Sequence, residues 1–423
     1  MCPQPRTAHL PAAASATGDV GAGRRAAARR RAGVVPALAV LTAVVALASC
    51  SSSGGTSGDR AVGSAPADTG APPTTGGPGR ICLTGTLAYD HHDAEAGPDK
   101  VKQLTTSVAR GTTWQLWGRT SASGAEQLLA TGRTDQHDGR FEACSDQTGP
   151  LPELHLTFRS SNGNLWKAVD PTTRAEYSFD TPHLTDIAAS RDLGTVKAPA
   201  EQQGAWKIVD TLGDLYRKAN AANTTGSPCW TDHQSAGGCD ELTFTWSPTA
   251  TKGGFFDPES RDVVLAAEDP DSRHLILHEA GHWLHFELSD HWFPDAPGCE
   301  NHTFEVASTG GCAWTEAFAD AVAAYTLGDH RYVYSDGQSV DLHNDPTTTW
   351  DKGDTVQGRI GGSLLDLWAA DGPDGGSWNK DLQLMARYHA ADFREYFTVY
   401  RPKAGLPTTG PSRQIIGGHT IDY

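Results

Sequence analysis

The spacing of apolar residues changes once along this chain, near residue 200, and that change limits what the chain can fold into. From residue 81 to about residue 185, apolar and polar residues alternate in short runs, such as 113–117 and 154–158, which Gly and Asp separate. Alternation with a period of two indicates half-buried strands, and several such strands in succession are typical of an all-β sandwich. We therefore predict a β-sandwich domain over residues 81–195.

After residue 200 the apolar residues follow a helical spacing instead. Ile208, Leu212 and Leu215 fall on one side of a helix expected over residues 205–221, as a period of 3.6 residues requires. Strands and helices that occupy separate stretches of one unit indicate an α+β architecture. We therefore predict a mainly helical α+β domain over residues 200–423. Its other expected elements are a buried strand over 262–267 and helices over 315–327, 355–369 and 382–396.

One further helix of this domain combines charged residues with apolar neighbours. Asp269 and Pro270 predict its N-cap and first position, and its pattern runs to about Leu288. The helix contains the sequence HEAGH at residues 278–282, with leucine or isoleucine at 275, 276, 277 and 284. Charged side chains in such surroundings cost free energy unless they are paired or bind a metal.

The spacing within HEAGH suits a metal site. His278 and His282 are four residues apart, so they lie on one face of the helix and reach a single ion. Neutral imidazole suits zinc, and catalytic zinc sites use three protein ligands and leave a position for water. Glu279 is placed beside that position, where a carboxylate takes the proton of an activated water.

A later helix supplies a candidate third ligand. Glu316 opens the sequence EAFAD at residues 316–320, and Asp320 follows four residues later on the same helical face. A carboxylate at Asp320 is expected to accept a hydrogen bond from the outer nitrogen of a ligand histidine, which fixes the tautomer of that ring. The alternative is that both acids lie on a solvated face. The neighbouring HEAGH sequence favours the metal site.

Together, HEAGH and EAFAD resemble the motifs of the gluzincins, zinc peptidases with thermolysin-like sites. The resemblance implies a zincin-like domain that binds Zn²⁺ through His278, His282 and Glu316. It implies Glu279 as the general base, Asp320 behind the ligands, and hydrolysis of peptide bonds in a protein or peptide substrate. A metzincin is disfavoured, because the segment after His282 has no glycine at the turn position and no histidine at position 288.

The sandwich region carries a less specific resemblance. Residues 128–135 and 138–141 are similar to the transthyretin-like accessory domains of bacterial surface proteins. An immunoglobulin-like sandwich predicts nearly the same shape, so both architectures stay open. No catalytic group of residues stands out in this region.

The N-terminal residues predict export. A basic stretch with arginines at 24, 25 and 29–31 precedes an apolar run over 34–48 that is too short to span a bilayer. The run ends in Leu-Ala-Ser-Cys, which resembles the lipobox of bacterial lipoproteins and implies a lipid on Cys50. An ordinary signal peptide is the alternative. We expect a lipoprotein signal peptide over residues 1–49 and a disordered tether over 50–80, which would hold the protein at the outer face of the membrane.

Six cysteines follow Cys50, and their even number in an exported chain indicates disulfides. Because they fall into neighbouring couples, the expected pairs are Cys82–Cys144, Cys229–Cys239 and Cys299–Cys312. The last pair would hold Glu316 in register with the two histidines. A metal site made by Cys299 and His302 is the alternative, and oxidising conditions disfavour it.

The net charge and the open alternatives limit the function further. The formal net charge is -17 at pH 7, whereas a nucleic-acid binder needs a basic face, so no nucleic-acid partner is expected. Two other classes stay open: a surface binding module with a structural or inactive metal site, and an enzyme that uses the metal on a non-peptide substrate. Glu279 disfavours the first, because a structural zinc site needs no base. The sequence does not choose the oxyanion-stabilising group among Tyr325, His330, Tyr332, Tyr334, His343 and Arg359.

Overall fold

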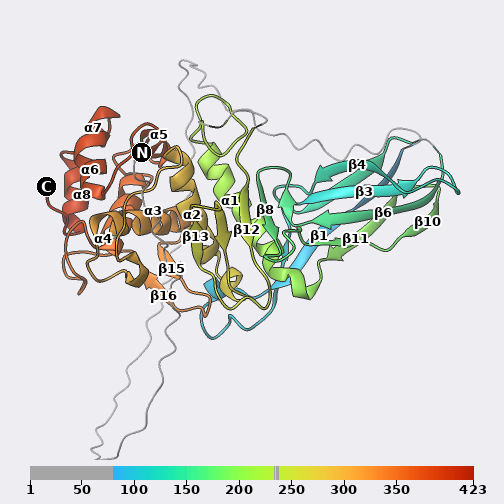
Figure 1. The fold of residues 1–423 in the computed structure, drawn as a ribbon, viewed down its shortest axis with the longest axis horizontal. Coiled ribbons are helices and arrows are strands. Elements are labelled where there is room, and N and C mark those ends of the chain that lie inside the picture. The colour runs from blue at the N-terminus through green and yellow to red at the C-terminus, as the bar shows by residue number, and fades with distance from the viewer. Residues whose placement is uncertain (1–79, 148, 233, 235–237) are drawn as a thin grey trace, which may run out of the picture. The chain divides into compact units, whose positions relative to one another are not determined.

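The structure is a computed structural model of the chain and describes residues 80–147, 149–232, 234 and 238–423, which Figure 1 draws in colour. These residues belong to one compact unit. The expected signal peptide, the lipid-bearing Cys50 and all of the expected tether except Arg80 lie outside the described residues. None of the described helices is long and apolar enough to cross a membrane.

The first sheet is organised around the long strand β1 (Ile81–His91). Strands β5 (Arg140–Ser145) and β2 (Thr105–Val108) pair antiparallel with successive parts of one edge of β1. Strand β11 (Arg191–Lys197) pairs parallel with the other edge. Cys82 and Cys144 face each other in the β1–β5 register and form a disulfide.

A second sheet packs on the first. Its order is β10 (Leu184–Ile187), β6 (Leu151–Arg159), β3 (Thr113–Arg119) and β4 (Gln127–Arg133), and β9 (Ser178–Asp180) also pairs with β6. Burial alternates along β3 with the period of two that the sequence shows. Both sheets contribute to one apolar core, which contains Leu83, Leu116, Phe141, Leu156 and Phe158. The β-rich N-terminal part is therefore a sandwich, and with the C-terminal part it makes a two-domain architecture.

A third sheet belongs to the C-terminal part of the chain. Its order is β13 (Phe255–Asp257), β14 (Asp262–Val264), β12 (Leu242–Thr245), β8 (Trp166–Val169) and β7 (Ser161–Asn162). Strands β7 and β8 fall inside the range predicted for the sandwich, but β8 pairs with β12, and Trp166 and Ala168 lie in the C-terminal core. Alternating residues predict a strand but do not tell which sheet the strand joins. The predicted boundary of the sandwich at residue 195 therefore does not separate the strands of the two domains.

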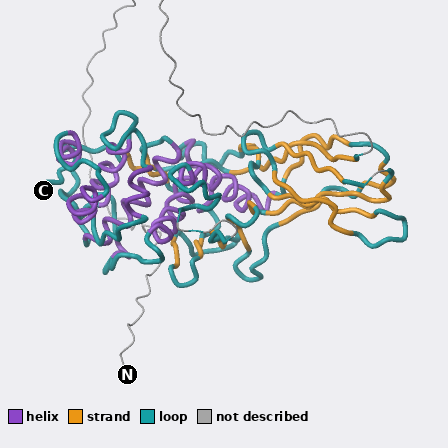
Figure 2. Tube along the Cα trace, turned by 90° about the horizontal axis from the view of Figure 1, so that it is seen from above, coloured by secondary structure: helices purple, strands orange, loops and turns teal. Residues whose placement is uncertain are grey.

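Helix α1 (Gln203–Asn220) links the two parts, because its residues contribute to both cores. Ile208, Leu212 and Leu215 are buried in the C-terminal core, as their spacing predicts. Trp206 lies instead in the sandwich core, with its ring edge-on to Phe179. Figure 2 shows the helices gathered in one part of the described chain and most strands in the other.

The remaining helices surround α2 (Arg273–Leu288) and α3 (Gly310–Leu327), which pack against each other. All residues of α2 except Arg273 and Leu275 are buried, and these buried residues include four histidines and two glutamates. The other elements are η1 (Ala94–Ala96), η2 (Ala200–Gln202), η3 (Asp269–Asp271), η4 (Cys299–Asn301), β15 (Arg331–Val333), β16 (Ser339–Asp341), α4 (Gln357–Trp368), α5 (Asn379–Met385), α6 (Phe393–Glu395), the π-helix η5 (Tyr396–Tyr400), α7 (Arg401–Lys403) and α8 (Pro411–Gly418).

Two helix predictions were wrong. The HEAGH helix does not begin at Asp269, whose side chain accepts a hydrogen bond from the Ala266 amide at 2.6 Å within a separate short turn. Ser272 is the N-cap, and its hydroxyl accepts from the amide of Leu275. The helix predicted over 382–396 is broken, because Asp392 starts a new helix by accepting from the amide of Glu395.

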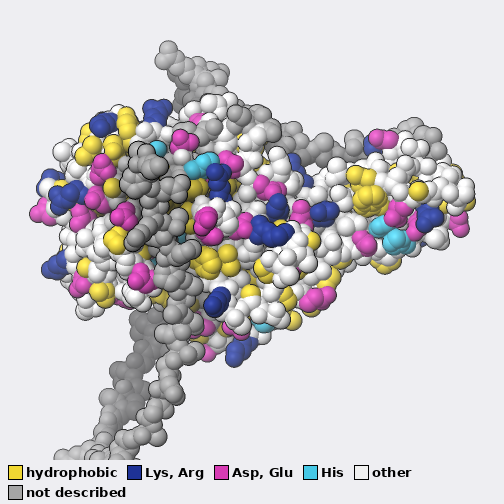
Figure 3. All heavy atoms as spheres, viewed as in Figure 1, with side chains coloured by type: hydrophobic (Ala, Val, Ile, Leu, Met, Phe, Trp, Pro, Cys, Tyr) yellow, Lys and Arg dark blue, Asp and Glu magenta, His cyan; other side chains and the backbone are white. Residues whose placement is uncertain are grey.

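The surface carries charge of both signs. Acidic and basic side chains are interspersed over the face that Figure 3 shows. This distribution agrees with an acidic chain that presents no single basic face in that view.

Candidate metal centre

The site begins with the close approach of α2 and α3. Gly281, the fourth residue of HEAGH, lies against α3 so closely that a Cβ there would be 2.9 Å from Cα of Ala319. Glycine therefore lets the two helices pack with their polar residues facing each other. His278 and His282 come from α2, and Glu316 and Asp320 come from α3.

The three predicted ligands converge. Nε2 of His278 and Nε2 of His282 are 3.1 Å apart. Each of these nitrogens lies 3.3 Å from Oε2 of Glu316. All three side chains are almost fully buried. The helical spacing of the histidines and the packing of α3 together create this cluster.

The cluster fits a zinc ion by the chemistry of its donors. In a tetrahedral site with zinc–ligand distances of about 2.0–2.2 Å, neighbouring donor atoms are roughly 3.3 Å apart. The observed separations of 3.1 and 3.3 Å agree with that value. Two imidazoles and one carboxylate also form a donor set that zinc prefers.

Asp320 contacts the outer nitrogen of His278, one of the predicted ligands. Its Oδ1 is 2.8 Å from Nδ1 of His278, and its Oδ2 accepts a hydrogen bond from Nε2 of Gln357 at 2.7 Å. The contact orients His278 with Nε2 toward Glu316. Gln357 is the first residue of α4 and was not predicted, since nothing in its local sequence links it to a metal site.

The ionisation of the site follows from burial and from its charges. Burial lowers the pKa of His278, but hydrogen bonds with Asp320 and Glu316 raise it by more, so that it lies well above the ordinary value. Burial raises the pKa of Glu316, but the charge of His282 and hydrogen bonds with His278 and His282 hold it well below the ordinary value. Glu316 is therefore a carboxylate, which is the form that binds a cation.

Glu279, the second residue of HEAGH, lies beside the two histidines. It is 4% exposed, and its Oε2 has no hydrogen-bond partner among the described residues. Burial raises its pKa, and the charges of His278 and His282 oppose that effect. One carboxylate oxygen of Glu279 and one nitrogen of each histidine all lie within 4.8 Å of one another. A carboxylate oxygen without a hydrogen-bond partner, close to both histidines, is suited to accept a proton.

The six candidates for the oxyanion donor have different neighbours in the structure. The Tyr332 ring lies edge-on to His278 with centroids 5.5 Å apart, and Tyr334 packs edge-on to Tyr332. Burial raises the pKa of Tyr332 well above the ordinary value, so its phenol keeps its proton. Arg359 donates to backbone carbonyls such as those of Asp345 and Thr348. The others pack elsewhere: Tyr325 against Trp378, and His330 against His343.

A residue outside the predicted ligand set also reaches the cluster. Nε2 of His302 lies 3.3 Å from Oε2 of Glu316, the same separation that His278 and His282 show. His302 follows η4 in the connection between α2 and α3, where no helical spacing relates it to HEAGH. Its only sequence signal was its position three residues after Cys299.

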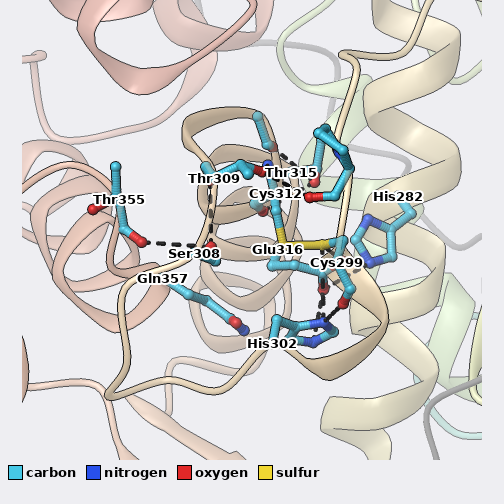
Figure 4. Close-up of a disulfide and its surroundings, with 12 residues drawn as sticks. His282, Cys299, His302, Ser308, Thr309, Cys312, Thr315, Glu316, Thr355 and Gln357 are labelled. Atoms are coloured by element: carbon cyan, nitrogen blue, oxygen red, sulfur yellow. Dashed lines mark hydrogen bonds and ion pairs between the residues drawn. A yellow bond between two sulfur atoms is a disulfide. The ribbon is translucent and has the colours of Figure 1, made fainter.

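The Cys299–Cys312 disulfide joins this connection to the first turn of α3, as Figure 4 shows. Cys299, His302 and Cys312 lie close enough to suggest a metal site of their own. Both thiols are consumed in the disulfide, however, so a metal site made by Cys299 is excluded. The Cys229–Cys239 pair is also formed, which completes the three expected pairings.

The sandwich contacts the start of α2. Oε1 of Glu95, in η1, accepts hydrogen bonds from the backbone amides of Arg273 at 2.7 Å and His274 at 3.1 Å. The same oxygen lies 3.1 Å from Nδ1 of His274. A carboxylate at a helix N-terminus satisfies amides that lack partners within the helix. The N-terminal domain thus helps to fix the helix that bears both histidines.

Residues 82–205 match the mycolysin middle domain, and residues 221–420 match the mycolysin C-terminal domain, which includes α2 and α3. No curated protein matches. Among solved structures, a 9R-lipoxygenase from Cyanothece aligns with 13% identity and a TM-score of 0.17, over 34% of this chain and 24% of that one. The two domain matches show that the chain is a mycolysin-like, peptidase-related protein.

Proposed function

We propose that this protein is a zinc-dependent peptidase that hydrolyses peptide bonds at the outer face of a bacterial membrane. The observation that carries the proposal is the convergence of His278, His282 and Glu316, with donor atoms 3.1–3.3 Å apart. The relation to mycolysin supports a metallopeptidase, and therefore zinc. The proposed lipid on Cys50 would keep the enzyme at the membrane, and its substrates would be proteins or peptides.

When bound by His278, His282 and Glu316, Zn²⁺ supplies a Lewis acid for a carbonyl group and lowers the pKa of a water molecule. Glu279 acts as the general base in this proposal. Its carboxylate takes a proton from water as the water oxygen bonds to the peptide carbonyl carbon. Glu279 then gives that proton to the amide nitrogen as the carbon–nitrogen bond breaks. The products are a carboxylate and an amine.

Other side chains of the site have supporting roles. Asp320 holds His278 with its Nδ1 toward the carboxylate, so that Nε2 is free to bind a metal. Tyr332 is the proposed donor to the oxygen of the reacting carbonyl, because it packs on His278 and keeps its proton. A neutral donor placed beside a site of developing negative charge stabilises the transition state.

The proposal is tested by assaying the full-length protein on a mixed peptide library and on cell-wall fragments. Glu279→Gln should reduce peptide hydrolysis by about a hundredfold or more, the range typical of a lost general base. Glu259→Gln is the matched control, because Glu259 is an exposed residue of a surface turn. Equal hydrolysis by wild type and Glu279→Gln would contradict the proposal. Activity on cell-wall fragments alone would assign the site to a non-peptide substrate.

A surface binding module with an inactive metal site is the second candidate. The sandwich domain favours it, since the candidate ligands His278, His282 and Glu316 all come from α2 and α3 and none from this domain. In that case the wild-type protein binds zinc and cleaves none of the peptides.

The proposed lipid anchor is tested separately by Cys50→Ser, which should release the protein from membranes. Wild-type protein that is already soluble would exclude the anchor.

A further inference from the structure

His302 stands in the same relation to Glu316 as the two histidines of HEAGH. The three Nε2 atoms of His278, His282 and His302 each lie 3.3 Å from one oxygen of Glu316. Figure 4 shows His302 and His282 on two sides of Glu316, with the Cys299–Cys312 disulfide beside them. One carboxylate oxygen thus faces three imidazole nitrogens.

The tautomer of His302 is set by its other nitrogen. Nδ1 of His302 lies 2.6 Å from the backbone oxygen of Cys299. A carbonyl oxygen only accepts hydrogen bonds, so Nδ1 carries the proton and donates it to this oxygen. Nε2 of the neutral ring is then an unprotonated nitrogen with a lone pair, directed at the cluster. This is the arrangement that metal-ligating histidines show, with the outer nitrogen bonded to a carbonyl or carboxylate.

Hydrogen bonds alone do not account for the cluster. A carboxylate oxygen offers two lone pairs, so Oε2 of Glu316 cannot accept hydrogen bonds from all three histidines at once. The Nε2 atoms of His278 and His282 are also only 3.1 Å apart, so protons on both would clash. A shared cation removes both difficulties, because every nitrogen then offers a lone pair.

The separations also match a four-ligand site. Four donors around a tetrahedral zinc ion are roughly 3.3 Å from one another. Oε2 of Glu316 is 3.3 Å from each of the three nitrogens, and Nε2 of His278 is 3.1 Å from Nε2 of His282. If His302 binds the same ion, it takes the fourth corner of the tetrahedron, which catalytic zinc sites leave to water.

We propose that His302 is a fourth protein ligand of the zinc site and closes it in this conformation. The inference rests on the proposed function for the identity of the metal. The side chain of His302 is 27% exposed, compared with 7% for His278 and 9% for His282. It is therefore the outermost ligand and the one that gives way when water and a substrate enter.

The position of His302 depends on the loop that carries it. Its Nδ1 partner is the carbonyl of Cys299, and Cys299 is joined to Cys312 in the first turn of α3. Glu316 follows one turn later on the same helix. The disulfide thus ties the fourth ligand to the element that carries the third, which keeps both at one ion.

The proposal is tested by X-ray absorption spectroscopy at the zinc edge of the full-length protein in the Glu279→Gln background, which avoids self-cleavage. The spectrum should show scattering from three imidazoles, and from two after His302→Ala. Competition with a chelator should show zinc affinity falling at least about tenfold in His302→Ala, since even partners behind zinc ligands contribute 10- to 100-fold. His137→Ala, at an exposed histidine of the sandwich, should leave both readouts unchanged.

The outcomes separate this inference from the proposed function. Two imidazoles in the protein with His302 intact, or unchanged zinc affinity in His302→Ala, would overturn the role of His302 and leave the peptidase proposal standing. Three imidazoles without peptide hydrolysis would uphold His302 and reject the peptidase. If folded protein binds no zinc, both fail. The spectrum of the protein with His302 intact decides the question even if His302→Ala does not fold.

Discussion

Nδ1 of His278 lies 2.8 Å from Oδ1 of Asp320, so a residue of α3 sets the orientation of a candidate ligand on α2. The other oxygen of Asp320 accepts from Gln357 at the start of α4. Three helices are therefore joined through one buried carboxylate. Their packing fixes the direction in which Nε2 of His278 points.

The first prediction follows from this contact. Asp320→Asn should lower zinc affinity by about 10- to 100-fold, because the ring of His278 loses the charged partner that fixes its tautomer. Chelator competition measures the change, and Asp371→Asn, at an exposed loop residue, is the control. Wild-type affinity in Asp320→Asn would show that the carboxylate does not support the ligand.

Glu95 supports the second prediction, which concerns pH. Burial raises the pKa of Glu95, but hydrogen bonds with His274 and the charge of Lys207 lower it by more, to about 2. Since the folded-state pKa lies below the unfolded value, Glu95 stabilises the fold above about pH 4.5, and this contribution is lost as the pH falls toward 2. Glu95→Gln should cost about 3 kcal/mol at pH 7 at most.

Urea unfolding of both proteins at pH 7 and at the lowest pH that keeps them folded measures this contribution. The difference in free energy of unfolding between wild type and Glu95→Gln should shrink as the pH falls. A difference that stays constant with pH would show that the charge of Glu95 is not what stabilises the start of α2.

Tyr332 carries the third prediction. If its phenol donates to the oxygen of the reacting carbonyl, Tyr332→Phe should lower kcat by about a hundredfold and leave KM nearly unchanged. The ring contact with His278 is retained in phenylalanine, so zinc content should not change. Steady-state kinetics on a cleaved peptide provides the measurement. Full activity of Tyr332→Phe would assign the donor role to another group.

The fourth prediction concerns the Cys299–Cys312 disulfide. Replacing both cysteines with serine should cost roughly 3 kcal/mol of stability, as expected for a short closed loop. It should also weaken zinc binding, because the loop with His302 is no longer joined to α3. Replacing Cys229 and Cys239 opens a loop of similar length outside the site and is the matched control. Equal zinc affinity in both double variants would refute the positioning role.

The sequence pointed to candidate ligands on α2 and α3 because the relations within each helix are local. His278 and His282 are fixed by one helical turn, and Glu316 and Asp320 by another. The closeness of the two helices was predicted only through the motif pair, and Gly281 explains it physically.

The features that could not be predicted depend on distant parts of the chain. His302 lies in an irregular connection between two helices. Gln357 begins a helix whose sequence pattern indicates its buried face but no contact with a metal site. Apolar and polar residues alternate in strand β8 as in the strands before it, yet β8 pairs with β12. Trp166 of β8 lies opposite Leu242 of β12, which is 76 residues later in the chain. Ser272 and Asp269 are both residue types that favour N-cap positions. The side chain of Asp269 accepts from the amide of Ala266 instead, so Ser272 caps the helix.

The proposed metal site is tested most directly by the zinc content of purified, folded full-length protein. Mass spectrometry measures it in the wild type, in Glu316→Ala and in Glu279→Gln. We expect near-stoichiometric zinc in the wild type, weakened zinc binding in Glu316→Ala, and retained zinc without peptide hydrolysis in Glu279→Gln. Folded wild-type protein that binds no zinc, or a Glu316→Ala variant that holds zinc as tightly as the wild type, would contradict the proposed metal site.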